Sequence, residues 1–316
     1  MVKRGFTLIE ILFVLIIITF LIIGAFEIIG KIYKRNFMVT KTSEFEFLTQ
    51  QTLDQISGMI YYRVPLSVIG YNYSVTPQYK YIGEITEDDN YTVLEWIGEA
   101  FDAKQEANLS GFIDLYASDS ENKILVAKDF NKDFIKDVLK YKFNTLSSIE
   151  NIIGIIFAGS FDRGEEGVLD DYENAFGWHG GGHNHVFTAS SIKPSGNDSN
   201  DSNITLNEKP NRIYAKFYLA DSAYAIARFG DLNKSNWNCG VSAPESDDTL
   251  LFFYNYRPWK GETFCGDGGV GDVTVLAENV KAFKVKAVNE HLELKITIKK
   301  IKDDINITVS KQKAVF

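Results

Sequence analysis

Hydrophobic positions are densest in the first 30 residues and become periodic after them. From Phe6 to Ile29 the apolar run is broken only by Thr7, Glu10, Thr19 and Glu27. Twenty-four helical residues span about 36 Å at 1.5 Å each, more than the hydrocarbon core of about 30 Å. The pattern predicts a helix over 6–30 that crosses a membrane once.

The helical pattern continues to about residue 62. No proline occurs before Pro65, and no glycine lies between Gly30 and Gly58. Apolar residues form one stripe at helical spacing, made of Phe45, Leu48, Leu53, Ile56, Met59 and Ile60. We predict that 31–62 is the amphipathic half of the same helix and that its stripe packs on a sheet.

After about residue 64 the chain changes to short runs rich in Ile, Val, Tyr and Phe, separated by Asn, Asp and Gly. Such runs predict strands at 79–85, 91–97, 111–116, 152–158, 212–219, 223–229, 249–256, 273–275, 282–287, 292–299 and 305–310. One short amphipathic helix is predicted at 129–139. The fold class is therefore α+β, a long helical spine packed on a mainly antiparallel β-sheet head over 63–316.

Composition and charge narrow the class of protein. The chain has 316 residues, 45% of them hydrophobic and 24% charged, which is typical of a globular head rather than of disorder or of a multi-span membrane protein. A formal charge of −9 disfavours nucleic acid as a partner. Lys3 and Arg4 precede the apolar run, so the positive-inside tendency predicts a cytoplasmic N-terminus and an extracytoplasmic head.

The residues around the start of the apolar run carry a specific motif. Lys3-Arg4-Gly5-Phe6-Thr7-Leu8-Ile9-Glu10 resembles the class III leader of type IV pilins and type II secretion pseudopilins. The resemblance implies that residues 1–5 are a leader, that a prepilin peptidase cleaves between Gly5 and Phe6, and that the new amino group of Phe6 is methylated. It also implies a single-pass protein of the bacterial inner membrane with a periplasmic head, which later enters a filament or its tip.

Glu10 is a carboxylate within the membrane segment, which is costly unless it is paired and therefore marks a candidate functional site. In the family that the leader resembles, the acid at this position is thought to meet the Phe amino group of a neighbouring subunit. The alternative is an incidental Glu in a plain signal anchor.

The segment from Val273 to Lys300 carries a second resemblance. The sequence ENVKAFKVKAV followed by HLELKITIKK is similar to the closing hairpin of the large minor subunits, the J-type pseudopilin and the W-type minor pilin. The alternative is a generic terminal hairpin that turns near Asn289 and Glu290. We expect a minor pilin or minor pseudopilin that acts in filament initiation or tip assembly, is not an enzyme, and contacts other subunits and the inner-membrane assembly platform.

A glycine-rich segment, Trp178 to His185, holds His179, His183 and His185. Three imidazoles can bind a transition metal, which would make the chain an anchored metal-dependent hydrolase. The segment lacks a His-Glu-x-x-His pattern, and a solvated surface loop is the simpler interpretation. A tip adhesin or binding subunit is a third possibility.

The acidic segment just upstream is a candidate calcium loop, because calcium takes several oxygen ligands. Its candidate ligands are Asp162, Glu165, Glu166, Asp170 and Asp171. The EF-hand spacing is not met, and a solvated charged surface is the alternative. Residues 196–203 read as a disordered connection, with Asp198 and Asp201 as a weaker calcium option.

The two cysteines, Cys239 and Cys265, are candidates for one disulfide, since export would place them in an oxidising compartment. Two unpaired thiols are the alternative.

Overall fold

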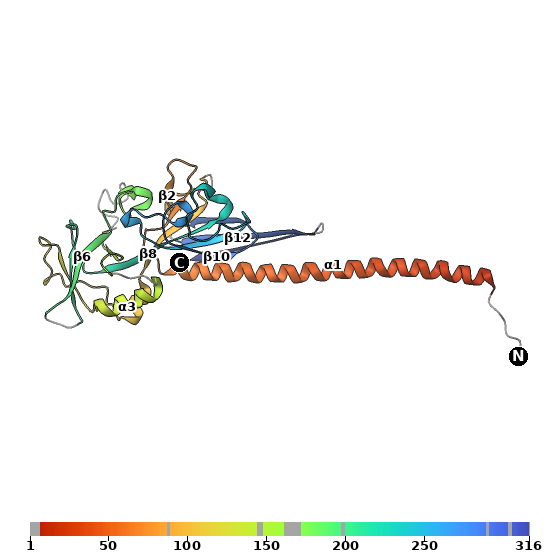
Figure 1. Ribbon diagram of the computed structural model, residues 1–316, viewed down its shortest axis with the longest axis horizontal. Coiled ribbons are helices and arrows are strands. Elements are labelled where there is room, and N and C mark those ends of the chain that lie inside the picture. Colours follow the sequence, from red (N-terminus) through yellow and green to blue (C-terminus); the bar gives the residue numbers. More distant parts are fainter. Residues whose placement is uncertain are drawn as a thin grey trace.

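A long N-terminal apolar helix leads into a mainly antiparallel β-sheet domain in the computed structural model of the protein (Figure 1). The structure describes residues 7–86, 89–143, 148–160, 172–196, 200–288, 291–302 and 305–315. The helix projects far beyond the domain, so that the start of α1 and the domain lie at opposite ends of the described structure.

The helix α1 (Leu8–Tyr61) runs without a break for 54 residues, which is about 81 Å at 1.5 Å per residue. Thr7 caps its start. The chain leaves the helix at Tyr62, shortly before Pro65, whose ring and missing N–H cannot be accommodated in a helix interior. Among the described residues, α1 is the one helix long and apolar enough to cross a membrane.

The two halves of α1 have different surroundings. The large apolar side chains between Leu8 and Ile29 are exposed, whereas Phe45, Leu53, Ile56 and Ile60 are buried. Leu48 and Met59 are partly buried against the same cluster. The stripe predicted on the second half of the helix is therefore confirmed as the face that packs on the head.

The main sheet is antiparallel, with strand order β2-β1-β3-β8-β5-β6-β7-β4, and β9 and β10 attached beside β8. Its strands are β1 (Ile69–Tyr71), β2 (Tyr79–Tyr81), β3 (Val93–Glu99), β4 (Ile124–Ala127), β5 (Gly154–Phe157), β6 (Phe187–Pro194), β7 (Ser202–Leu206), β8 (Phe217–Arg228), β9 (Leu250–Tyr256) and β10 (Asp272–Ala277). The 12-residue β8 is central, because it pairs with β3, β5 and β9.

A second sheet of three antiparallel strands closes the chain. It consists of β11 (Val280–Val288), β12 (His291–Lys302) and β13 (Ile305–Val315) in simple order. Alternate residues such as Leu294, Ile296 and Val309 are buried in one cluster with the stripe of α1 and with Trp96 of β3. In Figure 1 the long β12–β13 hairpin extends alongside α1 toward its N-terminal half.

Short helices and turns complete the head. They are α2 (Phe101–Glu106), α3 (Lys132–Phe143), and the 3-10 turns η1 (Ile82–Glu84), η2 (Tyr172–Asn174), η3 (Trp178–Gly180), η4 (Phe229–Asp231), η5 (Lys234–Asn236), η6 (Pro258–Lys260) and η7 (Cys265–Asp267). Two further apolar clusters include residues of the main sheet, one around Trp178 and Trp259, the other around Phe130 and Phe157.

Several predicted boundaries differ from the structure. The segment 111–116 contributes only isolated bridges. The strands predicted at 212–219 and 223–229 overlap one continuous strand, β8, which begins only at Phe217. The connection predicted to be disordered at 196–203 contains the start of β7. Strands β1, β4, β6 and β7 and helix α2 were not predicted.

Candidate functional site

The start of α1 places Glu10 in a capping box. The Thr7 hydroxyl oxygen accepts a hydrogen bond from the Glu10 amide at 3.4 Å, and Glu10 Oε2 accepts from the Thr7 amide and hydroxyl, each at 3.0 Å. Both residues are exposed, and no described residue donates to Glu10 Oε1. Glu10 therefore has one carboxylate oxygen satisfied within its own chain and one free to accept from another molecule. Gly5 and Phe6 lie outside the described residues.

The surface that follows Glu10 is apolar on every side of the helix. Large side chains remain at least two-fifths exposed from Leu8 to Ile29, including Phe13, Ile17 and Phe26. A helix that is hydrophobic all round is a membrane span or the core of a larger assembly. This half of α1 therefore needs lipid, neighbouring helices, or both in turn.

The three candidate metal-binding histidines have separate roles. His179 in η3 adopts a left-handed backbone conformation, with φ of 46°, and its imidazole is buried. Its Nε2 atom lies 2.7 Å from Glu95 Oε1 on β3. His183 Nδ1 lies 3.2 Å from the Val186 carbonyl oxygen. The His185 amide donates to the Ala175 carbonyl oxygen at 3.1 Å.

Glu95 and His179 belong to a buried polar network. The Tyr256 hydroxyl donates to Glu95 Oε2 at 2.8 Å, and the His179 ring stacks on Tyr71 with centroids 3.8 Å apart. The Tyr71 hydroxyl in turn donates to Asp267 Oδ2 at 2.8 Å. Burial, together with these hydrogen bonds to carboxylates, raises the pKa of both tyrosines. Because Glu95 is fully buried and His179 nearly so, the network ties β1, β3, β9, η3 and η7 together rather than presenting ligands to solvent.

The described residues hold no group of three or more His, Cys, Asp or Glu side chains placed to bind a metal ion. Asp162, Glu165, Glu166, Asp170 and Asp171 lie outside the described residues, as does Asp198. Asp201 is buried, and its carboxylate accepts from Lys128 Nζ at 2.7 Å and from the Asp129 amide at 3.0 Å. Burial alone would raise the pKa of Asp201, but these hydrogen bonds lower it below its ordinary value.

Cys239 and Cys265 form a disulfide in the structure. Both cysteines are buried in the cluster that contains Phe253 and Phe264. The bond joins the segment after η5 to η7, whose Asp267 belongs to the Glu95 network. It therefore holds one end of that network in place.

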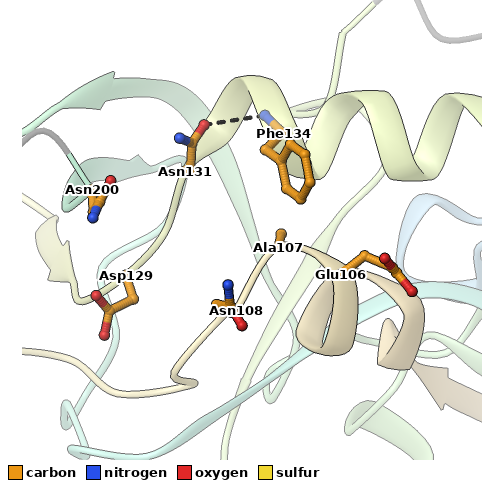
Figure 2. A pocket seen from close by; sticks show the side chains of 7 residues that line it. All are labelled: Glu106, Ala107, Asn108, Asp129, Asn131, Phe134 and Asn200. Carbon is orange, nitrogen blue, oxygen red and sulfur yellow. Dashed lines mark hydrogen bonds between the residues drawn. The ribbon is translucent and has the colours of Figure 1, made fainter.

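A small pocket of about 240 Å³ lies between α2, the start of α3 and residue 200 (Figure 2). Asn108 and Asp129 both have left-handed backbone conformations there, and Asn131 Oδ1 accepts from the Phe134 amide to begin α3. Figure 2 shows the Glu106 carboxylate on the far side of the pocket from Asp129. The oxygen atoms of this pocket are thus spread around its rim rather than gathered about a point.

A wider groove of about 920 Å³ opens where α1 meets the head. Its walls include two stacked aromatic pairs, Tyr62 with Phe101 and Tyr224 with Phe252, with centroids 3.6 and 5.6 Å apart. Lys142 also lines it and pairs at 2.7 Å with Asp221, which is fully buried. The groove offers apolar surface for contact with another protein.

Two features of these sites were not predicted from the sequence, for different reasons. The capping box was readable, because Thr7-x-x-Glu10 before an apolar run is its signature. The Glu95–His179 contact has no local signal, since its residues are 84 positions apart.

No family model, no curated protein and no solved structure matches the chain.

Proposed function

We propose that this protein is a structural subunit of a type IV-type filament, a minor pilin or minor pseudopilin that acts in filament initiation or at the tip. The observation that carries the proposal is the first half of α1, which is apolar all round, exposed, and opened by a single carboxylate. The leader sequence ending at Gly5 and the head packed only on the second half of the helix also support it.

The proposed mechanism is assembly of exposed helices. In the membrane, lipid covers residues 8–30; in the filament, the helices of neighbouring subunits replace the lipid. Glu10 Oε1 then accepts from the free amino group that cleavage creates on Phe6 of a neighbour, and this charge pairing offsets the cost of an acid in an apolar environment. The Oε2 atom of Glu10 keeps its hydrogen bonds from Thr7 while Oε1 accepts from the neighbour.

The anchored metal-dependent hydrolase is less well supported by the geometry. His179 is occupied by Glu95 and stacked on Tyr71, so it is not oriented to share an ion with His183 and His185. An adhesive or binding role of the head is compatible with the proposal, since the aromatic groove at the base of the head would remain open in a tip subunit.

The test separates the charge of Glu10 from its capping role. Glu10→Gln keeps an oxygen for the Thr7 donors but removes the charge, whereas Thr7→Ala removes the cap, at a cost of about 1 kcal/mol, and keeps the charge. We expect Glu10→Gln to be processed but absent from sheared or secreted filaments, and Thr7→Ala to be incorporated. Wild-type incorporation of Glu10→Gln would refute the charge-pairing mechanism.

Processing is tested independently by mass spectrometry of the mature protein. In cells with an active prepilin peptidase we expect the chain to begin at Phe6 with a methylated amino group, and a Gly5→Val variant to retain residues 1–5. Retention of Met1 to Gly5 in the wild-type protein would refute the filament-subunit assignment as a whole.

A further inference from the structure

Charge is strongly segregated between the last sheet and the rest of the head. Residues 280–316 contain nine lysines and four acidic residues, a net charge of +5. Residues 63–279 contain 18 basic and 33 acidic residues, a net charge of −15. The small sheet β11–β13 is therefore a basic element on an acidic head.

The strand register places several of these lysines on one side of the sheet. Lys284 on β11 lies directly opposite Lys295 on β12, and Lys299 follows Lys295 on the same face. We call these three residues the lysine face. The opposite face carries Leu294 and Ile296 and packs on α1, so the lysine face points away from the helix.

The lysine face is electrostatically unfavourable in the isolated chain. Like charges directly opposite each other in a sheet are destabilising. Neighbouring lysines are neutralised, since Lys286 pairs with Glu293 at 2.9 Å and Lys281 pairs with Asp248. In the part of the chain that the structure describes, Lys284, Lys295 and Lys299 have no carboxylate within ion-pair distance. An external anionic partner would relieve their mutual repulsion.

The orientation of the sheet indicates where that partner lies. Strands β12 and β13 run alongside α1, so the lysine face is parallel to the spine and not across its end (Figure 1). A membrane crossed by α1 meets the spine across its axis, whereas a protein stacked beside the spine meets it along its length. The lysine face is thus presented to a lateral neighbour.

We infer that the lysine face binds the acidic head surface of a second copy of this chain. The complementary charge is present on the same molecule, because the head outside this sheet carries −15. A contact between two different surfaces of identical chains is head-to-tail, so one copy contributes its lysine face and its neighbour contributes the acidic surface. In a minor subunit this contact joins a few copies side by side in the initiating or tip complex. The inference rests on the proposed function, which it deepens by naming the neighbour and the surfaces that meet.

The experiment uses the full-length chain in vesicles of neutral phosphatidylcholine, with unlabelled and ¹⁵N-labelled copies mixed. A carbodiimide joins a lysine amine to a carboxylate only where the two groups touch. A cross-linked pair of peptides, one labelled and one unlabelled, therefore comes from two different copies; we call such pairs mixed peptides. We expect mixed peptides that link Lys284, Lys295 or Lys299 to acidic residues within 63–279. Their yield should fall in 1 M salt, where the Debye length is about 3 Å.

Two triple variants make the test specific. Lys284→Glu, Lys295→Glu and Lys299→Glu together should lower the yield of mixed peptides about tenfold or more, because like charges then face each other across the contact. Lys136→Glu, Lys140→Glu and Lys193→Glu change the net charge equally at lysines away from this sheet and should leave the yield unchanged. A Lys→Gln version of the first triple, checked by circular dichroism, separates loss of contact from misfolding.

Two outcomes in neutral vesicles would overturn the inference: mixed peptides that avoid the lysine face, or equal losses in both triple variants. A third would be that these lysines bind only to vesicles in which phosphatidylglycerol replaces part of the phosphatidylcholine. The last would assign the face to anionic lipid. Failure here with normal Gly5 cleavage and a Glu10-dependent filament would leave the proposed function standing, whereas an uncleaved leader would refute the function even if the copies cross-link.

Discussion

Glu150 is a single carboxylate whose environment makes folding stability depend on pH. Lys132 Nζ lies 2.5 Å from its Oε1, and the Ser148 hydroxyl donates to Oε2. Burial alone would raise the pKa of Glu150, but the bonds from Lys132 and Ser148 lower it to about 2. The folded value is below the ordinary 4.5, so the stabilisation is complete above about pH 4.5 and is lost as the pH falls toward 2.

We expect Glu150→Gln to lower the free energy of unfolding by about 1 kcal/mol at pH 7, a figure reduced for the partial exposure of Lys132. The difference from the wild-type protein should shrink between pH 4.5 and pH 2. Urea unfolding of both proteins at several pH values measures it. Glu106→Gln, at an exposed position on α2, is the control and should show no difference at any pH; a pH-independent loss in Glu150→Gln would contradict the ion-pair explanation.

Glu95 is the residue whose removal should damage the head most. Without its carboxylate, the buried Tyr256 hydroxyl and His179 Nε2 lose their partner, and leaving such groups unpaired costs about 3 kcal/mol. We expect that loss of unfolding free energy in Glu95→Leu and a smaller one in Glu95→Gln, which keeps an acceptor. Urea unfolding at pH 7 measures both. Wild-type stability of Glu95→Leu would mean that the network does not hold the head together.

At the scale of one element, the second half of α1 has a buried face and an exposed face that can be compared directly. Ile56 is fully buried in the cluster shared with β12 and β13, whereas Phe47, which precedes it on the same helix, is exposed. We expect Ile56→Ala to destabilise the head by about 2 to 4 kcal/mol, through lost burial and the cavity left behind. Phe47→Ala should cost less than about 0.5 kcal/mol. Chemical unfolding of the full chain in detergent compares them, and equal effects would contradict the packing assigned to the stripe.

Elements with strong periodicity were predictable from the sequence, and those held by distant contacts were not. The spine and its stripe followed from apolar spacing alone. By contrast, β7 begins in an Asn- and Ser-rich segment and depends on tertiary contacts, such as the Ser202 hydroxyl donating to the Phe130 carbonyl and the ion pair of Asp201 with Lys128. The strand predicted at 111–116 becomes a turn, because the Asp114 carboxylate accepts from the amides two and three residues later.

The same distinction applies to the candidate sites. Glu10 was identified because an acidic residue within an apolar run can be recognised from the sequence alone. The burial of His179 could not be foreseen, because Glu95 and Tyr71 reach it only after β1, β3 and η3 have packed together. The lysine face likewise becomes visible only when strand register places Lys284 opposite Lys295.

Two signals bear on the orientation that the whole molecule would take across a membrane. Lys3 and Arg4 precede the apolar helix, but Lys31, Lys34 and Arg35 follow it, so the basic residues alone do not decide which end is cytoplasmic. The Cys239–Cys265 disulfide adds an independent argument, since such bonds persist in oxidising compartments. On the ground of the disulfide we predict that the head lies outside the cytoplasm.

Cysteine labelling in spheroplasts tests this orientation. Tyr116→Cys places a thiol at a fully exposed position of the head, and Lys3→Cys, combined with Gly5→Val to retain the leader, places one before the helix. A membrane-impermeant maleimide should label the head thiol in intact spheroplasts and the leader thiol only after permeabilisation. Labelling of Lys3→Cys alone would place the head in the cytoplasm, where neither the disulfide nor an extracytoplasmic filament is expected, because that compartment keeps thiols reduced.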